Sequence, residues 1–335
     1  MPVGLMNLSG PVQGLLNRGY PDIGQTFYLV DSNYRTAAQG WSKSDGTGPL
    51  ELYDERNPGY VFRTGDYTRD GVCIQAAIDA MVDFRGDTLY YTPGAYSIAT
   101  TALAVNVPDA RWVGSPVSCP MSARATITAA VAAAIGMTGA SDRMEFAFLK
   151  FIPMTAQSMF AIADGAEGLH FHNFYYDVTG IATNVATQMV LAAGTMDNSA
   201  FTDFVFRTDA AQGPMIELDG LVRSLLIARF QHFHQVGTLA VSLLQVDDAG
   251  TTGVTIGPGH GQIGGTGGVT YLFQHTDMTS NATNITVKGF TGSVGYCAAA
   301  TLCDAAGAAA EADYTLNYIA TVGGGNGATL YTGTS

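Results

Sequence analysis

The stretch that decides the fold is "DGVCIQAAIDAMVDFRGDTLYYTPGAYSI", residues 70–98. Its first half predicts a short amphipathic helix, because Asp70 is a good N-cap and Ile74, Ile78 and Met81 recur on one helical face. A helix placed directly before a set of strands can cover their exposed end. The first half of the stretch therefore predicts a helix that caps a β array.

The second half of the stretch predicts where that array starts. "TLYY" alternates in polarity, the chain breaks at Pro93–Gly94, and "AYSI" alternates again. Alternation is typical of strands, and Pro-Gly is typical of a turn. Leu89 and Tyr91 are therefore expected to form the first row of the core.

Composition agrees with a large β protein. Only 13% of the 335 residues are charged, and there are 41 glycines. Abundant Thr, Val, Phe and Tyr favour strands joined by tight turns. The net charge of −13 and the lack of basic runs exclude a nucleic-acid partner, since phosphate binding depends on clustered Lys and Arg.

Five segments repeat the same order of a short apolar strand, a Gly or Asp turn, and a second strand. If the first strands are aligned, the steps are 29, 27, 28 and 27 residues, and the positions taken as equivalent are Ile162, Leu191, Leu218, Val246 and Phe273. The second strands step less evenly, by 33, 23, 29 and 31 residues, and are centred on Phe171, Phe204, Ile227, Ile256 and Val287. A period near 28 with strands predicts a solenoid of about three short strands per coil.

Residues 71–98 also resemble the opening of right-handed parallel β-helix proteins of the pectate-lyase-like group. In that group a helix with Ile-Gln-Ala-Ala-Ile-Asp character precedes a strand that ends in Pro-Gly-x-Tyr, as it does here. The resemblance implies an all-β fold: a right-handed single-stranded parallel β-helix with a capping helix and an extended N-terminal arm. The group includes pectin-active enzymes, other polysaccharide lyases and hydrolases, and trimeric fibres and spikes of bacteriophages, so it indicates a fold more than a function.

Three regions are expected along the chain. Residues 1–68 are rich in Pro and Gly and predict a loop-rich docking arm, in which "TFYLV" and "YVF" are isolated strands. Residues 69–292 predict the capping helix and the β-helix, and residues 293–335 predict a C-terminal closing element, with "YTLNYIATV" as closing strands. The aromatic side chains expected to contact another subunit or another virion protein are Phe27, Tyr28, Tyr34, Trp41 and Tyr53.

A glycoside hydrolase would need two carboxylates about 5 to 9 Å apart, which successive coils about 4.8 Å apart can provide. Acids that follow the aligned first strand are Asp164, Asp219, Asp247 and Asp248, and those after the second strand are Asp177, Asp203 and Asp209. Asp219 and Asp247 are the weak catalytic candidates, because they fall on neighbouring coils. However, Asp-Gly is a common turn pair, and we interpret Asp164 and Asp219 as turn residues.

A lyase site would need clustered acids for calcium and a basic residue. Arg207, Arg223 and Arg229 lie in the right half of the chain, but no acid cluster accompanies them in the sequence. Enzymatic activity is thus left open and disfavoured; if present, it would be that of a glycoside hydrolase or a polysaccharide lyase.

Two histidine pairs, His170 with His172 and His232 with His234, each flank a Phe. Brought together they would bind zinc or nickel, but alternating His and Phe is more often a half-buried strand whose polar face meets solvent or a partner. We therefore predict no metal and no cofactor. Trp41 and Trp112 could stack on sugar rings, although a core or interface role is more frequent.

The remaining features bear on location. The four cysteines, Cys73, Cys119, Cys297 and Cys303, are expected to be reduced packing residues. The N-terminus lacks the pattern of a signal peptide, and no apolar segment is long enough to span a membrane, so no membrane partner is predicted.

The leading hypothesis is a non-enzymatic structural protein of a bacteriophage virion, made in the host cytoplasm. It would be a homotrimeric spike or a capsid decoration (cement) protein, anchored by its N-terminal arm to other proteins of the capsid or tail. The alternative is a phage tailspike depolymerase that cleaves host surface polysaccharide. A passive carbohydrate-binding protein is a third possibility, so a host surface glycan stays open as a partner.

Overall fold

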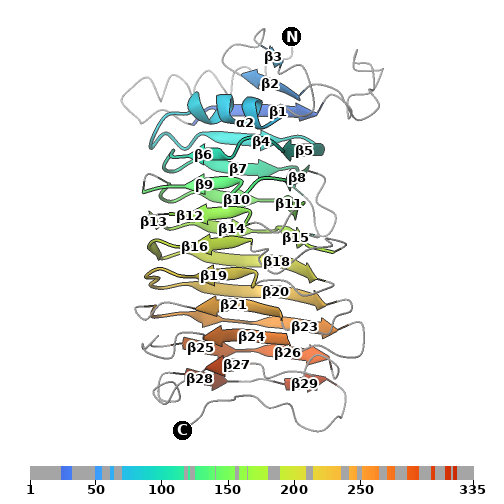
Figure 1. The fold of residues 1–335 in the computed structure, drawn as a ribbon, viewed down its shortest axis with the longest axis vertical. Helices are drawn as coiled ribbons and strands as arrows, with labels where there is room; N and C mark the ends of the chain where they lie inside the picture. The colour runs from blue at the N-terminus through green and yellow to red at the C-terminus, as the bar shows by residue number, and fades with distance from the viewer. Residues whose placement is uncertain are drawn as a thin grey trace, which may run out of the picture.

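The computed structural model describes residues 24–31, 50–54, 61–63, 70–116, 120, 125–139, 141–154, 158–163, 165–179, 189–208, 214–234, 241–246, 251–263, 270–275, 285–293, 303–305, 314–317 and 320–322. In these residues the chain winds into coils that stack along one axis, with a short helix at the N-terminal end (Figure 1). Strands on successive coils pair in parallel and in register. The fold is a parallel β-helix, as the sequence predicts.

Three walls of strands surround the core. Wall 1 is a parallel sheet that contains, within the described residues, the eight strands β6 (Leu103–Val105), β9 (Ile135–Met137), β12 (Phe160–Ile162), β16 (Val190–Ala192), β19 (Ile216–Leu218), β21 (Val241–Val246), β24 (Thr270–His275) and β27 (Cys303–Ala305). After wall 1 some coils add a short strand, β13 (Ala166–Glu167) or β17 (Met196–Asp197), and these two pair in parallel.

Walls 2 and 3 belong to one larger sheet that is bent along its length. Wall 2 contains β1 (Thr26–Asp31), β4 (Thr88–Tyr91), β7 (Arg111–Gly114), β10 (Glu145–Ala147), β14 (His170–His172), the first halves of β18 (Ala200–Thr208) and β20 (Leu226–His234), β22 (Thr255–Ile256), β25 (Ile285–Lys288) and β28 (Tyr314–Asn317). Wall 3 contains β5 (Gly94–Ile98), β8 (Ala125–Ala129), β11 (Leu149–Pro153), β15 (Tyr175–Asp177), the second halves of β18 and β20, β23 (Gly259–Ile263), β26 (Phe290–Ser293) and β29 (Ala320–Val322).

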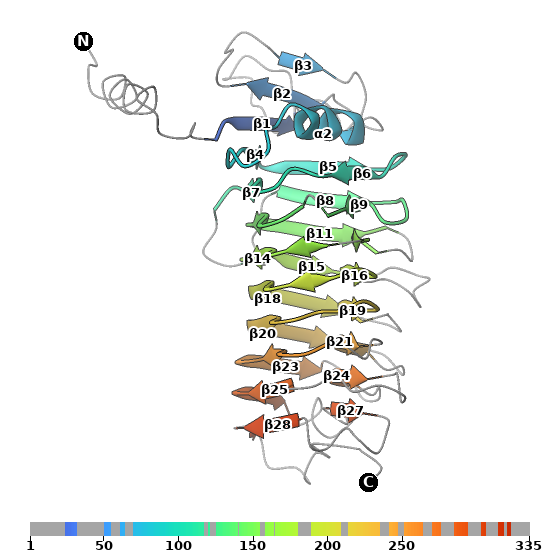
Figure 2. The same ribbon diagram turned by 90° about the vertical axis from the view of Figure 1, so that its left-hand side faces the viewer.

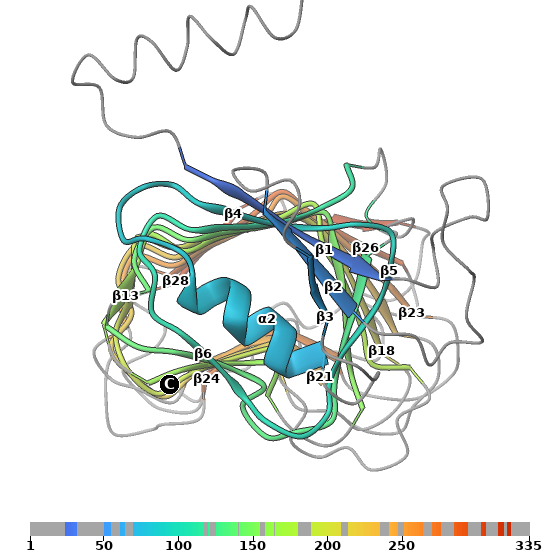
Figure 3. The ribbon, with the colours of Figure 1, turned by 90° about the horizontal axis from the view of Figure 1, so that it is seen from above.

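The coil is right-handed. Seen from the N-terminal end, the chain passes from wall 1 to wall 2 and on to wall 3 in a clockwise sense while it moves away from the viewer (Figure 3). Figure 2 shows the same walls from the side, with wall 1 and wall 2 at opposite edges of the molecule. Right-handedness is the usual sense for parallel strands joined by crossovers.

The bend between walls 2 and 3 is made by one residue in the left-handed region. Asn173, Asp203 and Arg229 have φ angles of 51°, 55° and 52°, and they occupy equivalent positions on successive coils. Asn and Asp adopt this region more readily than most residues, since their short polar side chains can bond locally. In β18 and β20 the bend falls inside a single continuous strand.

Aromatic residues form columns inside the coil. Phe146, Phe171 and Phe201 face one another across three coils, with ring centroids 4.5 and 4.7 Å apart in stacked arrangements. Trp112 continues the column at 5.5 Å from Phe146. All four side chains are fully buried, and register brings identical positions of each coil into contact.

The capping helix is confirmed. Helix α2 (Asp70–Asp79) lies across the N-terminal end of the coil (Figure 3) and buries Ile74, Ile78 and Cys73. The Asp70 carboxylate accepts a 2.9 Å hydrogen bond from the Ser97 amide of β5. The side chains of the other three cysteines lie outside the described residues.

The coil begins earlier than the sequence indicates. Strand β1 pairs in parallel with β4, and its Phe27 and Leu29 side chains are buried above Leu89 and Tyr91, so the row with Leu89 is not the first. Strands β2 (Leu50–Asp54) and β3 (Val61–Arg63) then extend the same sheet in antiparallel fashion (Figure 2). The prediction that "TFYLV" and "YVF" are isolated strands is wrong, because β1 pairs with β2 and β4, and β3 pairs with β2. The sequence hides the pairing of β1 with β4, since more than fifty residues separate the two strands.

The coil also continues past residue 292. Strands β27, β28 and β29 pair in parallel with β24, β25 and β26, where the sequence indicated a separate closing element. The function of residues 1–68 as a docking arm stays a prediction.

The repeat is confirmed, but part of its alignment is wrong. Ala192, not Leu191, is in register with Ile162 and Leu218. Phe201, not Phe204, is in register with Phe171, which makes the steps of the second strands 30, 26, 29 and 31 residues. His275, not Phe273, is in register with Val246.

Candidate functional site

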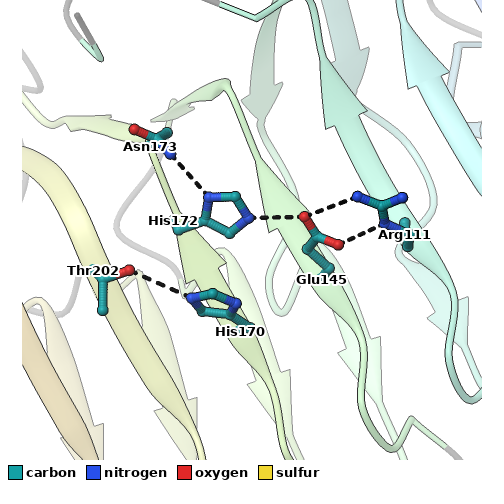
Figure 4. A network of polar contacts seen from close by, with 6 residues as sticks. All are labelled: Arg111, Glu145, His170, His172, Asn173 and Thr202. Atoms are coloured by element: carbon teal, nitrogen blue, oxygen red, sulfur yellow. Dashed lines mark hydrogen bonds and ion pairs between the residues drawn. The ribbon is translucent and has the colours of Figure 1, made fainter.

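A polar cluster lies on the outer face of wall 2, on strands β7, β10, β14 and β18 (Figure 4). Register places Arg111 beside Glu145, and Glu145 beside His170, on neighbouring coils. His172 is two residues further along β14, so it points to the same side of the sheet as His170. Arg111, Glu145 and His172 are linked by hydrogen bonds, with His170 beside them, and we treat this group as the candidate site.

Glu145 is the centre of the cluster. Its carboxylate accepts hydrogen bonds from Arg111 Nε and Nη2, at 2.5 and 3.2 Å, and from His172 Nε2 at 2.8 Å. The bond from His172, together with Arg111, lowers the pKa of Glu145 to about 2, although partial burial acts in the opposite direction. Glu145 therefore stays ionised at every physiological pH.

The contacts of His172 define its tautomer. Asn173 Nδ2 lies 2.9 Å from His172 Nδ1 and donates to it, and the opposite ring nitrogen carries the proton that Glu145 accepts. The His170 ring lies beside it, with centroids 4.5 Å apart. His170 Nε2 is 3.4 Å from the Thr202 hydroxyl. Burial, and then the neighbouring His172, lower the pKa of His170.

A second carboxylate borders the cluster at the bend. Asp203 accepts two 2.7 Å hydrogen bonds from the Arg229 guanidinium of the next coil. This bidentate pair lowers the pKa of Asp203, against a smaller effect of burial. Arg143 holds Asp109 in the same way, and the Arg223 amide donates to Asp197 at 2.9 Å. These ion pairs thus join one coil to its neighbour.

Wall 3 carries another charged group. Lys150 Nζ lies 3.1 Å from Asp177 and 4.8 Å from the centre of the Tyr175 ring. Burial is the largest influence on Asp177 and would raise its pKa, but bonds from Thr179 and Lys150 outweigh it, so the pKa lies below its usual value. Burial raises the pKa of Tyr175, whose side chain is only 3% exposed. This group is too enclosed to meet a large substrate directly.

These electrostatics bear on catalysis. A glycosidase needs a carboxylic acid whose pKa is raised so that it can protonate the leaving group. Glu145, Asp177 and Asp203 all have lowered pKa values. None of the three is suited to act as a general acid.

The predicted catalytic residues are only partly described. Asp219 is exposed on the turn after β19, where the amides of Asp219 and Gly220 both donate to the Ala192 carbonyl at 2.9 Å. A Cβ at Gly220 would lie 2.4 Å from the Gly194 oxygen, so this turn requires glycine. The geometry agrees with the turn interpretation. The other predicted acids in turns lie outside the described residues: Asp164, Asp209, Asp247 and Asp248.

Single acids accompany the predicted arginines. Arg229 binds Asp203, Arg223 adjoins Asp197, and Arg207 lies in register beside Asp177. They occur as separate pairs, one for each arginine. Among the described residues, no group of three or more His, Cys, Asp or Glu is arranged to hold a metal ion.

The two histidine pairs do not meet. His232 points into the core, fully buried, with its ring stacked 4.6 Å from Phe206 and its Nε2 3.4 Å from the Thr208 hydroxyl. The expectation that His232 lies on a polar outer face is wrong, because the left-handed bend at Arg229 reverses which residues of β20 face inward. His170 and His172 lie outside, on wall 2.

The predicted aromatic contacts have mixed positions. Phe27 is 3% exposed within the chain's own core, so its burial needs no partner. Tyr28 is half-buried and lies 5.4 Å from the Tyr90 ring, and the backbone of Tyr53 pairs with Tyr28. Tyr34 and Trp41 lie outside the described residues. Contact of these residues with another subunit stays a prediction.

Sequence reasoning missed Arg111 and Glu145. Both lie before the region where the repeat is regular, and the two are 34 residues apart. Aligning "RWV" at 111–113 with "EFA" at 145–147 would have placed them side by side.

Comparisons with known proteins add little beyond the fold. No protein-family model matches the chain, and no curated protein matches it. Among solved structures, Geobacillus virus E2 ORF18 aligns with a TM-score of 0.37 at 10% identity, covering 83% of this chain and 68% of that one. The Azotobacter vinelandii mannuronan C-5 epimerase AlgE6 A-module aligns at 0.31 and 12% identity, covering 79% and 93%. An alginate lyase from Paenibacillus sp. str. FPU-7 aligns at 0.33 and 12% identity, covering 75% and 96%. Scores and identities of this size carry no argument about function.

In the described part of the chain no helix is long and apolar enough to cross a membrane.

Proposed function

We propose that this chain is a non-enzymatic structural protein of a bacteriophage virion, a homotrimeric β-helix spike or capsid decoration protein anchored through residues 1–68. The assignment to a phage rests on the resemblance of residues 71–98 to the opening of the pectate-lyase-like β-helices, which include phage fibres and spikes. The non-enzymatic part rests on the charges of the outer walls.

One observation supports the structural role most directly. Four ion pairs each join two neighbouring coils: Arg111–Glu145, Arg143–Asp109, Arg229–Asp203 and Lys150–Asp177. A catalytic carboxylate has to be available to the substrate and to a proton, whereas these are occupied by cations of the same chain. The outer charges therefore stabilise the stacking of the coils.

The depolymerase remains the second candidate because of His170. Its imidazole is exposed, lies beside His172 and Glu145, and would be accessible to a long polysaccharide laid across wall 2. An exposed histidine of lowered pKa is a suitable general base near neutral pH.

Incubation of the purified chain with polysaccharide from the host surface separates the two. The structural proposal expects no change in polysaccharide chain length, measured by size-exclusion chromatography with light scattering. Shortening that disappears in His170→Gln or Glu145→Gln would establish the depolymerase with its site on wall 2. Shortening that disappears in Asp219→Asn or Asp247→Asn would establish it at the sequence candidates.

Sedimentation equilibrium tests the trimer independently. Three copies of the 35.1 kDa chain give a mass of roughly 105 kDa. A mass that stays at that of one chain across micromolar concentrations would contradict the trimer, and would leave the question of catalysis untouched.

A further inference from the structure

We propose that the His170–His172 pair, with Arg111 and Arg229 on either side, forms a proton-gated binding site for a small oxyanion such as a sulfate, phosphate or carboxylate group. The site lies on the outer face of wall 2 (Figure 4). The inference stands apart from the virion role, since it concerns the chemistry of this surface in any assembly.

The charges around the pair balance when both imidazoles are neutral. Strand β7 contributes Arg111 and β10 contributes Glu145, which bind each other. Strand β18 contributes Asp203 and β20 contributes Arg229, which also bind each other. Of these four, Glu145, Asp203 and Arg229 act directly on the His170 ring. A proton on His170 would therefore leave a local charge of about +1 on a chain whose net charge is −13.

The His172 ring lies beside His170, with centroids 4.5 Å apart, and its Nδ1 accepts the hydrogen bond from Asn173. The carboxylate of Glu145 is already shared between Arg111 and His172, and Asp203 is occupied by both guanidinium nitrogens that Arg229 directs at it. An external anion is therefore the group that can neutralise a proton on His170.

His170 can donate to that anion. The nitrogens of His172 are both engaged, by Glu145 and by Asn173, so His172 stays in place beside the His170 ring. His170 directs Nε2 at Thr202, and Nδ1 has no bonding partner in the described part of the chain. Its side chain is exposed, so an anion can reach the charged ring from solvent.

Proton binding and anion binding must then favour each other. An anion seated on His170 stabilises the imidazolium, and by linkage the imidazolium strengthens anion binding by the same factor. Affinity should rise as the pH falls through the range in which His170 titrates, which its lowered pKa places below the usual range of histidine. Sulfate is the best probe, because its own charge does not change in this range.

The test is calorimetric titration of the full chain with sodium sulfate at about pH 5.5 and about pH 8, at constant ionic strength, with glucuronate as the carboxylate arm. We expect sulfate to bind about tenfold more tightly, or more, at the lower pH. His170→Gln should remove that difference and leave the circular dichroism spectrum unchanged, since the side chain is exposed. Comparison of the affinities for sulfate and glucuronate identifies which kind of oxyanion the site prefers.

The matched control is His260→Gln, which changes a partly exposed histidine of β23 on wall 3. It should keep the pH dependence of the parent chain. Equal sulfate affinity at both pH values would contradict the proposed site. An equal loss of the pH dependence in His170→Gln and His260→Gln would also contradict it, because it would indicate only a general effect of net charge. Nuclear magnetic resonance gives a second readout, since sulfate should shift the ring resonances of His170 but not those of His260.

Discussion

At the scale of single residues, Glu145 shows how register creates a strong local field from ordinary side chains. One carboxylate accepts bonds from Arg111 and His172, which come from the coils on either side of it. Neither partner is near Glu145 in sequence. Its pKa of about 2 follows from that position.

Replacing Glu145 by Gln should reduce stability near neutral pH by about 1 kcal/mol, the upper range for a partly exposed ion pair. The sign of the pH dependence follows from the lowered pKa. Because the carboxylate is ionised more easily in the folded chain, its contribution is complete above about pH 4.5 and disappears as the pH falls toward 2. Urea unfolding of both chains at several pH values should therefore show curves that converge in acid.

Glu167→Gln is the matched control for this prediction, because Glu167 is an exposed acid on β13. Its unfolding midpoints should follow those of the parent chain at each pH. A constant difference between Glu145→Gln and the parent from pH 7 to pH 3 would show that Glu145 acts through packing rather than charge.

Ala133 has a backbone conformation that is unfavourable for alanine. Its φ is 48° in the turn between β8 and β9, and an L-residue with an ordinary Cβ is strained there by about 1–2 kcal/mol. Ala133→Gly should raise the thermal midpoint, since glycine adopts this region freely. The adjacent, exposed Ala132 has no positive φ, so Ala132→Gly should lower the midpoint slightly or leave it unchanged. A lower midpoint for Ala133→Gly would contradict the strain.

At the scale of elements, the sequence predicted the presence of strands well. It predicted less well which residues of successive coils lie in register. Regular steps between apolar residues made several features predictable. These are helix α2, the period near 28 residues, and the inward orientation of Phe171 and Ile227. The choice of Phe204 over Phe201 was an error of a different kind. Both are buried, one on each side of the bend at Asp203, and the sequence does not reveal that the bend lies between them.

The candidate site was harder to predict than the fold for a related reason. His170 and His172 were visible as a pair, but their partners come from other coils. A contact between Arg111 and Glu145 requires the register of two coils whose strands are only four and three residues long. Loops of unequal length between those strands hide that register from any fixed period.

The aromatic column of β10, β14 and β18 should be the element on which coil stacking depends most. Phe171 stacks on Phe146 at 4.5 Å and on Phe201 at 4.7 Å. Phe171→Ala should cost about 3–5 kcal/mol, as is usual when a fully buried ring is removed. Urea unfolding followed by tryptophan fluorescence measures the loss, since the buried Trp112 lies in the same column. Phe233→Ala, on the outer side of β20, should cost less than a third as much, and equal losses would contradict the column's importance.

At the scale of the whole molecule, stability is a sum over coils and the contacts between neighbours. Strands of wall 2 pair with the coil before them and the coil after them, as β18 does with β14 and β20. Such a solenoid has no single centre, so its parts should be removable as long as the register is kept. Parity is the stricter requirement, because a shift of one residue turns every inward side chain of a strand outward.

Removal of one coil tests this directly. Deleting residues 202–227 joins Phe201 to Ala228, and Ala228 occupies on its coil the position that Thr202 occupies on the previous one. Arg229 then replaces Asp203 at the bend, where both have a positive φ. We expect a soluble chain with the β-type circular dichroism of the parent and a somewhat lower thermal midpoint. Deleting residues 202–226 instead joins Phe201 to Ile227, two inward residues in succession, and should give an aggregated product. If the two deletions behave alike, coil register does not control the fold, and the account of walls 1 to 3 as separate in-register stacks fails.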